Sequence, residues 1–205
     1  MIKLFVFDLG NVILPFEHHQ IADKLYETSL VKDRCTPDGI SRFLFDFERG
    51  LINDYETGRM PTHEFFKKLK QKYKLELELD EFKDIWNDIF DEDPAVSQII
   101  LYLKSRGYPI FLLSNTNELH FSYIMERFPI IHHFDEWILS FEVGTKKPHG
   151  RIYDIIFEKR ALERHEVFYI DDIPEYVRAA AGYGIPGIVF REASDIWRVI
   201  NENCI

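Results

Sequence analysis

The feature that most constrains this chain is a short apolar run that ends on a single carboxylate. Residues 3–7 read KLFVF, Asp8 follows directly, and Gly10 stands two positions later. The run has strand length and no polar alternation, which is typical of a strand buried on both faces of a parallel sheet. Ligands of open α/β sheets bind at the carboxyl ends of strands, so Asp8 marks a candidate site.

Similar runs recur later in the chain and alternate with helical patterns. We expect four further strands, at residues 109–113, 136–139, 167–170 and 187–190. Apolar residues at helical spacing indicate helices between them, at residues 95–106, 150–162 and 174–183. This alternation predicts an α/β fold with a Rossmann-like parallel sheet.

The interval between the first and second strands is too long for one crossover helix. Most of it, residues 16–92, has helical patterning. LELEL at residues 75–79 alternates like a strand, but it is short, and we interpret it as a loop that enters the next helix. We therefore expect a catalytic core made of residues 1–15 and 93–205, with a helical cap domain inserted at residues 16–92.

Composition limits the classes of partner. The 205 residues carry a formal net charge of −10, which argues against a nucleic-acid-binding protein, because such proteins need a basic face. No apolar run reaches the length of a membrane span, and no signal-peptide cleavage pattern follows the N-terminus. Cys35 and Cys204 lie far apart and show no metal-type spacing, so we expect free thiols and a cytoplasmic location. The oligomeric state has no signal in the sequence.

Polar residues stand at four of the expected strand ends. Taken singly, each also suits a turn or a helix cap, and that alternative is the commoner one. Taken together they have the chemistry of phosphoryl transfer. The residues are Asp8, Ser114 with Asn115, Lys147, and Asp171 with Asp172.

A role follows for most of these side chains. Asp8 can attack phosphorus as a carboxylate nucleophile, and Asp171 and Asp172 can join it in holding a hard divalent cation, for which Mg²⁺ is the usual choice. Lys147 can neutralise the nucleophile and a phosphate oxygen. Ser114 and the N–H groups of the following helix start can hold the other phosphate oxygens. Because the global charge is negative, an anionic substrate needs these local positive groups.

The same residues lie in motifs that resemble those of the haloacid dehalogenase-like hydrolase superfamily. The resemblance covers essentially the whole chain, including a cap of the C1 type between the first two motifs. More narrowly, the motifs are similar to those of the bacterial α-D-glucose-1-phosphate phosphatase-type branch. The matching stretches are FDLGNVI (7–13), ETG (56–58), LLSNTN (112–117), GTKKP (144–148) and YIDD (169–172).

The resemblance implies a Mg²⁺-dependent phosphatase that acts on a small phosphorylated metabolite, with a sugar phosphate as one candidate. It implies that Asp8 is both the nucleophile and a metal ligand, with the backbone carbonyl of Gly10 as a second ligand. Asp172 is the expected direct ligand of the acidic pair, supported by Asp171. The implied phosphate-binding residues are Ser114, Asn115 and Lys147.

Two positions depart from the family pattern. Most phosphatases of the superfamily carry a second Asp, the general acid and base, where this chain has Gly10. A carbonyl ligand survives there but a proton donor does not. Tyr176 replaces a frequent Asn, which puts support of the metal site in doubt. Glu17, His18 and His19 follow the first motif and could supply a proton, although a surface or hinge role is the commoner one.

Other functions stay open. A 2-haloacid-type dehalogenase uses the same nucleophile without a metal, but typically lacks the acidic pair present here as Asp171 and Asp172. A phosphomutase would need the second Asp, so Gly10 counts against it. A weakly active binding or regulatory protein could share the fold. The loop at residues 56–59 is expected to face the active site, with Arg59 in solvent.

Overall fold

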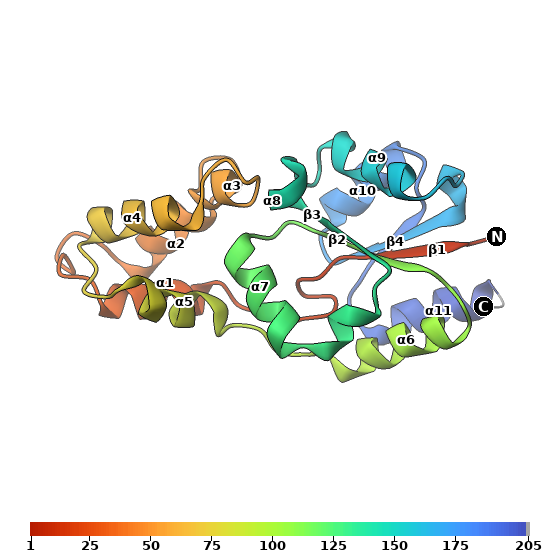
Figure 1. Ribbon diagram of the computed structural model, residues 1–205, viewed down its shortest axis with the longest axis horizontal. Coiled ribbons are helices and arrows are strands. Elements are labelled where there is room, and N and C mark those ends of the chain that lie inside the picture. The colour runs from red at the N-terminus through yellow and green to blue at the C-terminus, as the bar shows by residue number, and fades with distance from the viewer. Residues whose placement is uncertain (204–205) are drawn as a thin grey trace.

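The computed structural model describes residues 1–203 and has two parts (Figure 1). A parallel sheet flanked by helices forms one part, and a group of helices at its side forms the other. The strands are β1 (Leu4–Phe7), β2 (Ile110–Ser114), β3 (Glu136–Leu139), β4 (Val167–Asp171) and β5 (Gly187–Val189). The helices beside the sheet are α6 (Pro94–Ser105), α7 (Glu118–Arg127), α8 (Ser140–Val143), α9 (Gly150–Lys159), α10 (Pro174–Gly182) and α11 (Ala193–Glu202). Short 3₁₀ turns are η1 (Pro129–His133) and η2 (Arg164–Glu166).

The sheet confirms the expected α/β architecture. Its five strands are all parallel and follow the order β3-β2-β1-β4-β5, so β1 lies at the centre. Register places Phe7 opposite Leu112 on one side and opposite Ile170 on the other. The carboxyl ends of β1, β2 and β4 therefore meet at one edge, which is where Asp8 stands.

The central strands are buried on both faces, as their continuous apolar sequence predicts. All four residues of β1 are buried, and they alternate between two packed layers. Phe5 and Phe7 pack in the layer that includes residues of α6 and α11, whereas Leu4 and Val6 pack in the layer that includes residues of α9 and α10. Figure 1 shows these helix pairs on opposite sides of the sheet.

Local signals set the helix ends. The side chain of Asp93 accepts hydrogen bonds from the N–H groups of Ala95 and Val96 at the start of α6, and Gly107 follows that helix with a positive φ of 79°. The helix expected at residues 150–162 is shorter in the structure. It ends at Lys159 because Arg160 is extended, and a new capped turn then begins at Glu163.

The second part contains α1 (His19–Glu27), α2 (Pro37–Phe45), α3 (Ile52–Tyr55), α4 (Thr62–Tyr73) and α5 (Leu79–Asn87). These helices enclose a hydrophobic cluster of their own around the fully buried Trp86. Between α4 and α5 the chain is a loop, as expected, with only an isolated bridge from Leu75 to Ser29. This is the helical cap expected from the sequence; its limits at residues 16 and 92 stay a prediction.

In residues 1–203, none of the helices is long and apolar enough to cross a membrane. Cys35 is a free thiol, and Cys204 lies outside the described residues. The cytoplasmic location stays a prediction.

Candidate active site

Lys147 is the centre of the polar cluster at the carboxyl edge of the sheet. Its ammonium Nζ lies 2.8 Å from Oδ1 of Asp8 and 2.8 Å from Oδ2 of Asp171, and it donates a third bond to the carbonyl of Leu113 at 3.2 Å. The Lys147 side chain is only 1% exposed. Burial alone would lower the pKa of Lys147, but Asp171 and Asp8 outweigh it and raise that pKa, so the lysine is charged.

Asp8 follows β1 and is held from both sides. Its N–H donates to the carbonyl of Ile170 at 2.8 Å, and its Oδ1 accepts the N–H of Leu9 at 2.7 Å besides the Lys147 contact. Its Oδ2 has no hydrogen-bond partner within residues 1–203. With no cation present, burial raises the pKa of Asp8 to about 8, with Asp171 and Asp172 adding to the rise and Lys147 opposing it.

The two members of the acidic pair differ in their surroundings. Asp171 is fully buried, and both its oxygens are in use: Oδ2 accepts from Lys147 and from the hydroxyl of Tyr169, and Oδ1 accepts the N–H of Ile173 at 2.8 Å. Asp172 is half-buried and lines the cavity described below. Burial and the neighbouring Asp171 raise the pKa of the Asp172 carboxyl, which Lys147 partly opposes.

This carboxylate set fits a hard divalent cation. Asp8, Asp171 and Asp172 each offer an oxygen, and these oxygens lie within 4.8 Å of one another. Gly10 lines the same cavity as Asp8 and Asp172, and its carbonyl as a further ligand stays a prediction. Oxygen donors of this kind are those that Mg²⁺ prefers. Both oxygens of Asp171 already accept hydrogen bonds, whereas Asp172 lines the cavity; that Asp172 is the direct ligand and Asp171 its support stays a prediction.

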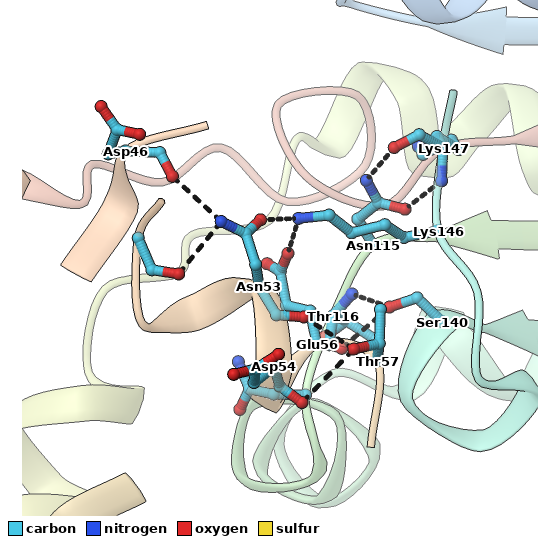
Figure 2. A network of polar contacts seen from close by, with 12 residues as sticks. Asp46, Asn53, Asp54, Glu56, Thr57, Asn115, Thr116, Ser140, Lys146 and Lys147 are labelled. Carbon is cyan, nitrogen blue, oxygen red and sulfur yellow. Dashed lines mark hydrogen bonds and ion pairs between the residues drawn. The ribbon is translucent and has the colours of Figure 1, made fainter. Parts of the chain in front are cut away.

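Asn115 fastens the loop that carries Lys147. Its Oδ1 accepts the N–H of Lys147 at 2.8 Å, and its Nδ2 donates to the Lys147 carbonyl at 3.1 Å (Figure 2). Both polar ends of the Asn115 side-chain amide are therefore in use within the protein. Ser114 ends β2 and is buried. That Ser114 and Asn115 bind phosphate stays a prediction.

Tyr176 contacts Lys147 and Asn115 from α10. Lys147 Nζ lies 5.1 Å from the centre of the Tyr176 ring, and the Tyr176 hydroxyl accepts a hydrogen bond from Asn115 Nδ2 at 3.3 Å. A cation over an aromatic face is stabilised by the ring quadrupole. Tyr176, which replaces the frequent Asn of the family pattern, thus supports both Lys147 and Asn115.

A cavity of about 240 Å³ opens above this cluster, between the sheet edge and the cap. Its floor is formed by Asp8, Gly10, Lys147 and Asp172. The cap contributes both aromatic and polar side chains, among them Phe45, Asn53 and Glu56. Neither Asn53 nor Lys146 was predicted as a site residue. Asn53 lines the cavity because α3 lies against the core, where Lys146 contacts it.

Lys146 links the core to the cap across one side of this cavity. Its Nζ donates to Asn53 Oδ1 and to Glu56 Oε2, the latter at 3.1 Å (Figure 2). Asn53 is itself fixed, because its Nδ2 donates to the carbonyls of Asp46 and Gly50 at 3.1 and 3.0 Å. The expectation that the loop at residues 56–59 faces the site is confirmed for Glu56. Arg59 is exposed, as expected, and pairs with Asp54 at 2.9 Å.

Residue 10 has no room for a side chain unless the ring of Phe16 moves. A Cβ on Gly10 would lie 2.4 Å from Cε1 of Phe16, well inside contact distance. Phe16 packs against Phe90 and against the imidazole of His18, with ring centres 5.5 and 4.6 Å apart. The space that a second Asp would occupy is therefore filled by an aromatic ring.

The three residues named as possible proton sources after the first motif have different positions. Glu17 and His19 are exposed and pair with each other at 3.4 Å. His18 lines the cavity and stacks on Phe45 with ring centres 4.1 Å apart. Burial lowers the pKa of His18 to about 4, so the imidazole is neutral at pH 7 and lacks the imidazolium proton that a general acid would donate.

The chain is similar in sequence and in fold to known proteins. The family described as haloacid dehalogenase-like hydrolase matches residues 44–190. A curated relative named D-ribitol-5-phosphate phosphatase, from Bacteroides thetaiotaomicron, is 28% identical over 179 residues, which cover 84% of each chain. A solved haloacid dehalogenase family enzyme of that organism, in complex with magnesium and inorganic phosphate, is 22% identical with a TM-score of 0.80 and covers 93% of this chain and 95% of that chain. The L-2-haloacid dehalogenase of Xanthobacter autotrophicus has a TM-score of 0.63 at 18% identity, over 91% and 76% of the two chains. These two structural likenesses show the fold.

Proposed function

Because this chain belongs to the haloacid dehalogenase-like hydrolases, we propose that it is a Mg²⁺-dependent phosphatase that cleaves a small phosphorylated metabolite through a phosphoaspartate on Asp8. One observation supports this above others: a buried Lys147 bridges Asp8 and Asp171 at the floor of a cavity that Asp172 also lines. A nucleophile, a fixed cation and a carboxylate set for a metal are the parts that phosphoryl transfer needs.

Asp8 is oriented for attack. Leu9 and Lys147 hold Oδ1, which leaves Oδ2 free to approach phosphorus. Attack forms an O–P bond to Asp8 and breaks the bond between phosphorus and the leaving alcohol, which takes up a proton. Water then attacks the phosphoaspartate, and phosphate leaves with Asp8 regenerated. Lys147 offsets the negative charge that accumulates when a carboxylate meets a phosphate dianion.

Asp8, Asp172 and the carbonyl of Gly10 would hold the Mg²⁺ ion, with Asp171 as support through Lys147. When bound, the ion supplies further positive charge for the phosphate oxygens. The raised pKa of Asp8 supports this proposal, because three converging carboxylates need a cation if Asp8 is to be ionised at neutral pH.

A sugar or sugar-alcohol phosphate is the substrate class that the cavity favours. A volume of about 240 Å³ suits a small leaving group, and the walls combine aromatic faces with the hydrogen-bonding groups of Asn53, Glu56 and Lys146. The curated relative is named for D-ribitol 5-phosphate, which is such a compound. Membership of the α-D-glucose-1-phosphate phosphatase-type branch stays a prediction.

The test is turnover of p-nitrophenyl phosphate with Mg²⁺ and with excess EDTA. We expect phosphate release with Mg²⁺ and its loss in EDTA. Activity that survives EDTA, together with halide release from 2-chloropropionate, would favour a dehalogenase instead. Turnover of neither compound would favour a binding protein. A screen that includes D-ribitol 5-phosphate and α-D-glucose 1-phosphate then separates the two substrate types.

A further inference from the structure

The proposed reaction needs a proton for the leaving alcohol, and residue 10 cannot supply it. Phe16 fills the space beside Gly10, so no neighbouring side chain replaces the missing carboxyl from that position. Proton transfer to a leaving group contributes roughly 10² to 10⁴-fold to such reactions, so a donor elsewhere in the cavity would matter.

Most ionisable side chains that line the cavity are unsuited to this task. Asp8 and Asp172 belong to the carboxylate set at the floor. His18 is neutral at pH 7, as described above. Asp46 is exposed, and its Oδ1 is occupied by the N–H groups of Glu48 and Arg49 at 3.1 and 2.7 Å. Of the carboxyl groups on the cavity wall, Glu56 remains.

Glu56 is both held and free. It caps the C-terminus of α3, and its side chain is 15% exposed. Oε2 accepts from Lys146 Nζ at 3.1 Å, which fixes the carboxyl group against the core, as Figure 2 shows. Oε1 has no hydrogen-bond partner anywhere in the described chain. One oxygen is thus anchored while the other is available to a ligand in the cavity.

We propose that Glu56 is the general acid of this enzyme and takes over the role that Gly10 cannot perform. Its Oε1–H gives its proton to the leaving oxygen as the bond from that oxygen to phosphorus breaks. The resulting Glu56 carboxylate then takes a proton from the water that attacks the phosphoaspartate, which restores the acid. The proposal rests on the phosphatase function proposed above.

The surroundings of Glu56 suit a proton carrier. Burial raises the pKa of the Glu56 carboxyl, while Lys146 and, more weakly, Lys147 lower it. Tyr176 faces the same group, and its pKa is raised to about 12, so it stays neutral. Burial thus favours the protonated carboxyl of Glu56 and Lys146 favours its carboxylate, which are the two forms that a proton carrier alternates between.

The experiment compares kcat/KM for p-nitrophenyl phosphate and for phenyl phosphate, whose leaving group is more basic and needs more protonation. Glu56→Gln preserves the size of the side chain and an oxygen for Lys146. We expect this variant to lose about 10²-fold on phenyl phosphate and only about threefold on p-nitrophenyl phosphate. We also expect the fall in kcat/KM for phenyl phosphate at high pH to disappear in this variant.

Two control variants separate proton transfer from a merely structural link. Lys146→Met breaks the contact between core and cap but keeps the acid. It should move the fall in kcat/KM to higher pH and lower kcat/KM for both esters by a similar factor. Asp54→Asn, on the exposed face of α3, should leave kcat/KM unchanged for both esters. Equal losses on both esters in Glu56→Gln would overturn the proposal and leave the phosphatase function intact. A parent protein that cleaves neither ester would overturn both.

Discussion

The fully buried Asp171 accepts a 2.8 Å hydrogen bond from Lys147, whereas the neighbouring Asp172 is half-buried and lines the cavity. The two adjacent acids are thus divided between tasks. Asp171 holds the lysine in place, and Asp172 faces the space where a metal would bind. Removing one partner of a buried pair leaves the other charge without compensation, which is strongly destabilising.

This division predicts different outcomes for two similar changes. Asp171→Ala should lower the free energy of unfolding by about 3 to 5 kcal/mol, because Lys147 would lose a buried partner. Asp172→Ala should leave unfolding nearly unchanged but abolish measurable Mg²⁺ binding. Urea unfolding and isothermal titration calorimetry check the pair. Similar effects of both variants on both measurements would contradict the division.

The contact between Gly10 and Phe16 predicts that the missing Asp cannot be restored by one substitution. Gly10→Asp should lower the free energy of unfolding by about 1 to 3 kcal/mol, since its Cβ would lie 2.4 Å from the Phe16 ring. In a Phe16→Ala background the same change should cost less, with a coupling of at least about 0.5 kcal/mol in the double-mutant cycle. Strictly additive costs would show that the ring is not the obstacle.

The raised pKa of Asp8 predicts how the metal-free protein responds to pH. The unfolded chain loses this proton near pH 3.8, whereas the folded chain keeps it to about pH 8. The folded state therefore binds more protons in between, and stability falls as pH rises. Burial lowers the pKa values of His18 and His120 to about 4 and about 3, which has the opposite effect, but only below their ordinary value of 6.5.

Between about pH 6.5 and 8 the histidines no longer contribute, so the effect of Asp8 can be measured alone. The melting temperature of the protein in EDTA should fall as the pH rises through this range. Saturating Mg²⁺ should flatten or reverse this slope, because the ion binds the ionised carboxylates more tightly as pH rises. A melting temperature that rises across this window in EDTA would contradict the raised pKa.

Much of the fold was predictable because its signals are local. The strand at β1 is apolar throughout since both of its faces are covered, and Pro94 and Gly107 mark the ends of α6 within two residues. The predicted length of α9 was wrong, because the capped turn at Glu163 competes with the last residues of the expected helix. Composition does not show whether residues 160–162 continue the helix or lead into the next turn, because backbone conformation decides between the two.

The site was predictable where it depends on strand ends and unpredictable where it depends on the cap. Asp8 and Asp171 meet at Lys147 because parallel strands end at one edge. Lys146 contacts Glu56 only because α3 packs over that edge. The two residues are 90 positions apart, and no pattern in the sequence indicates that they meet. The Phe16 ring at Gly10 is likewise a packing result that a motif cannot reveal.

Turnover of p-nitrophenyl phosphate by Asp8→Asn in the presence of Mg²⁺, with thermal unfolding measured alongside, tests whether Asp8 is the nucleophile. Asn keeps the size of the side chain and can still accept from Leu9, so the fold should survive. We expect kcat to fall by at least ~10³-fold with a cooperative unfolding transition retained, because the nucleophile is gone. A folded Asp8→Asn variant that turns over at the parent's rate would contradict it.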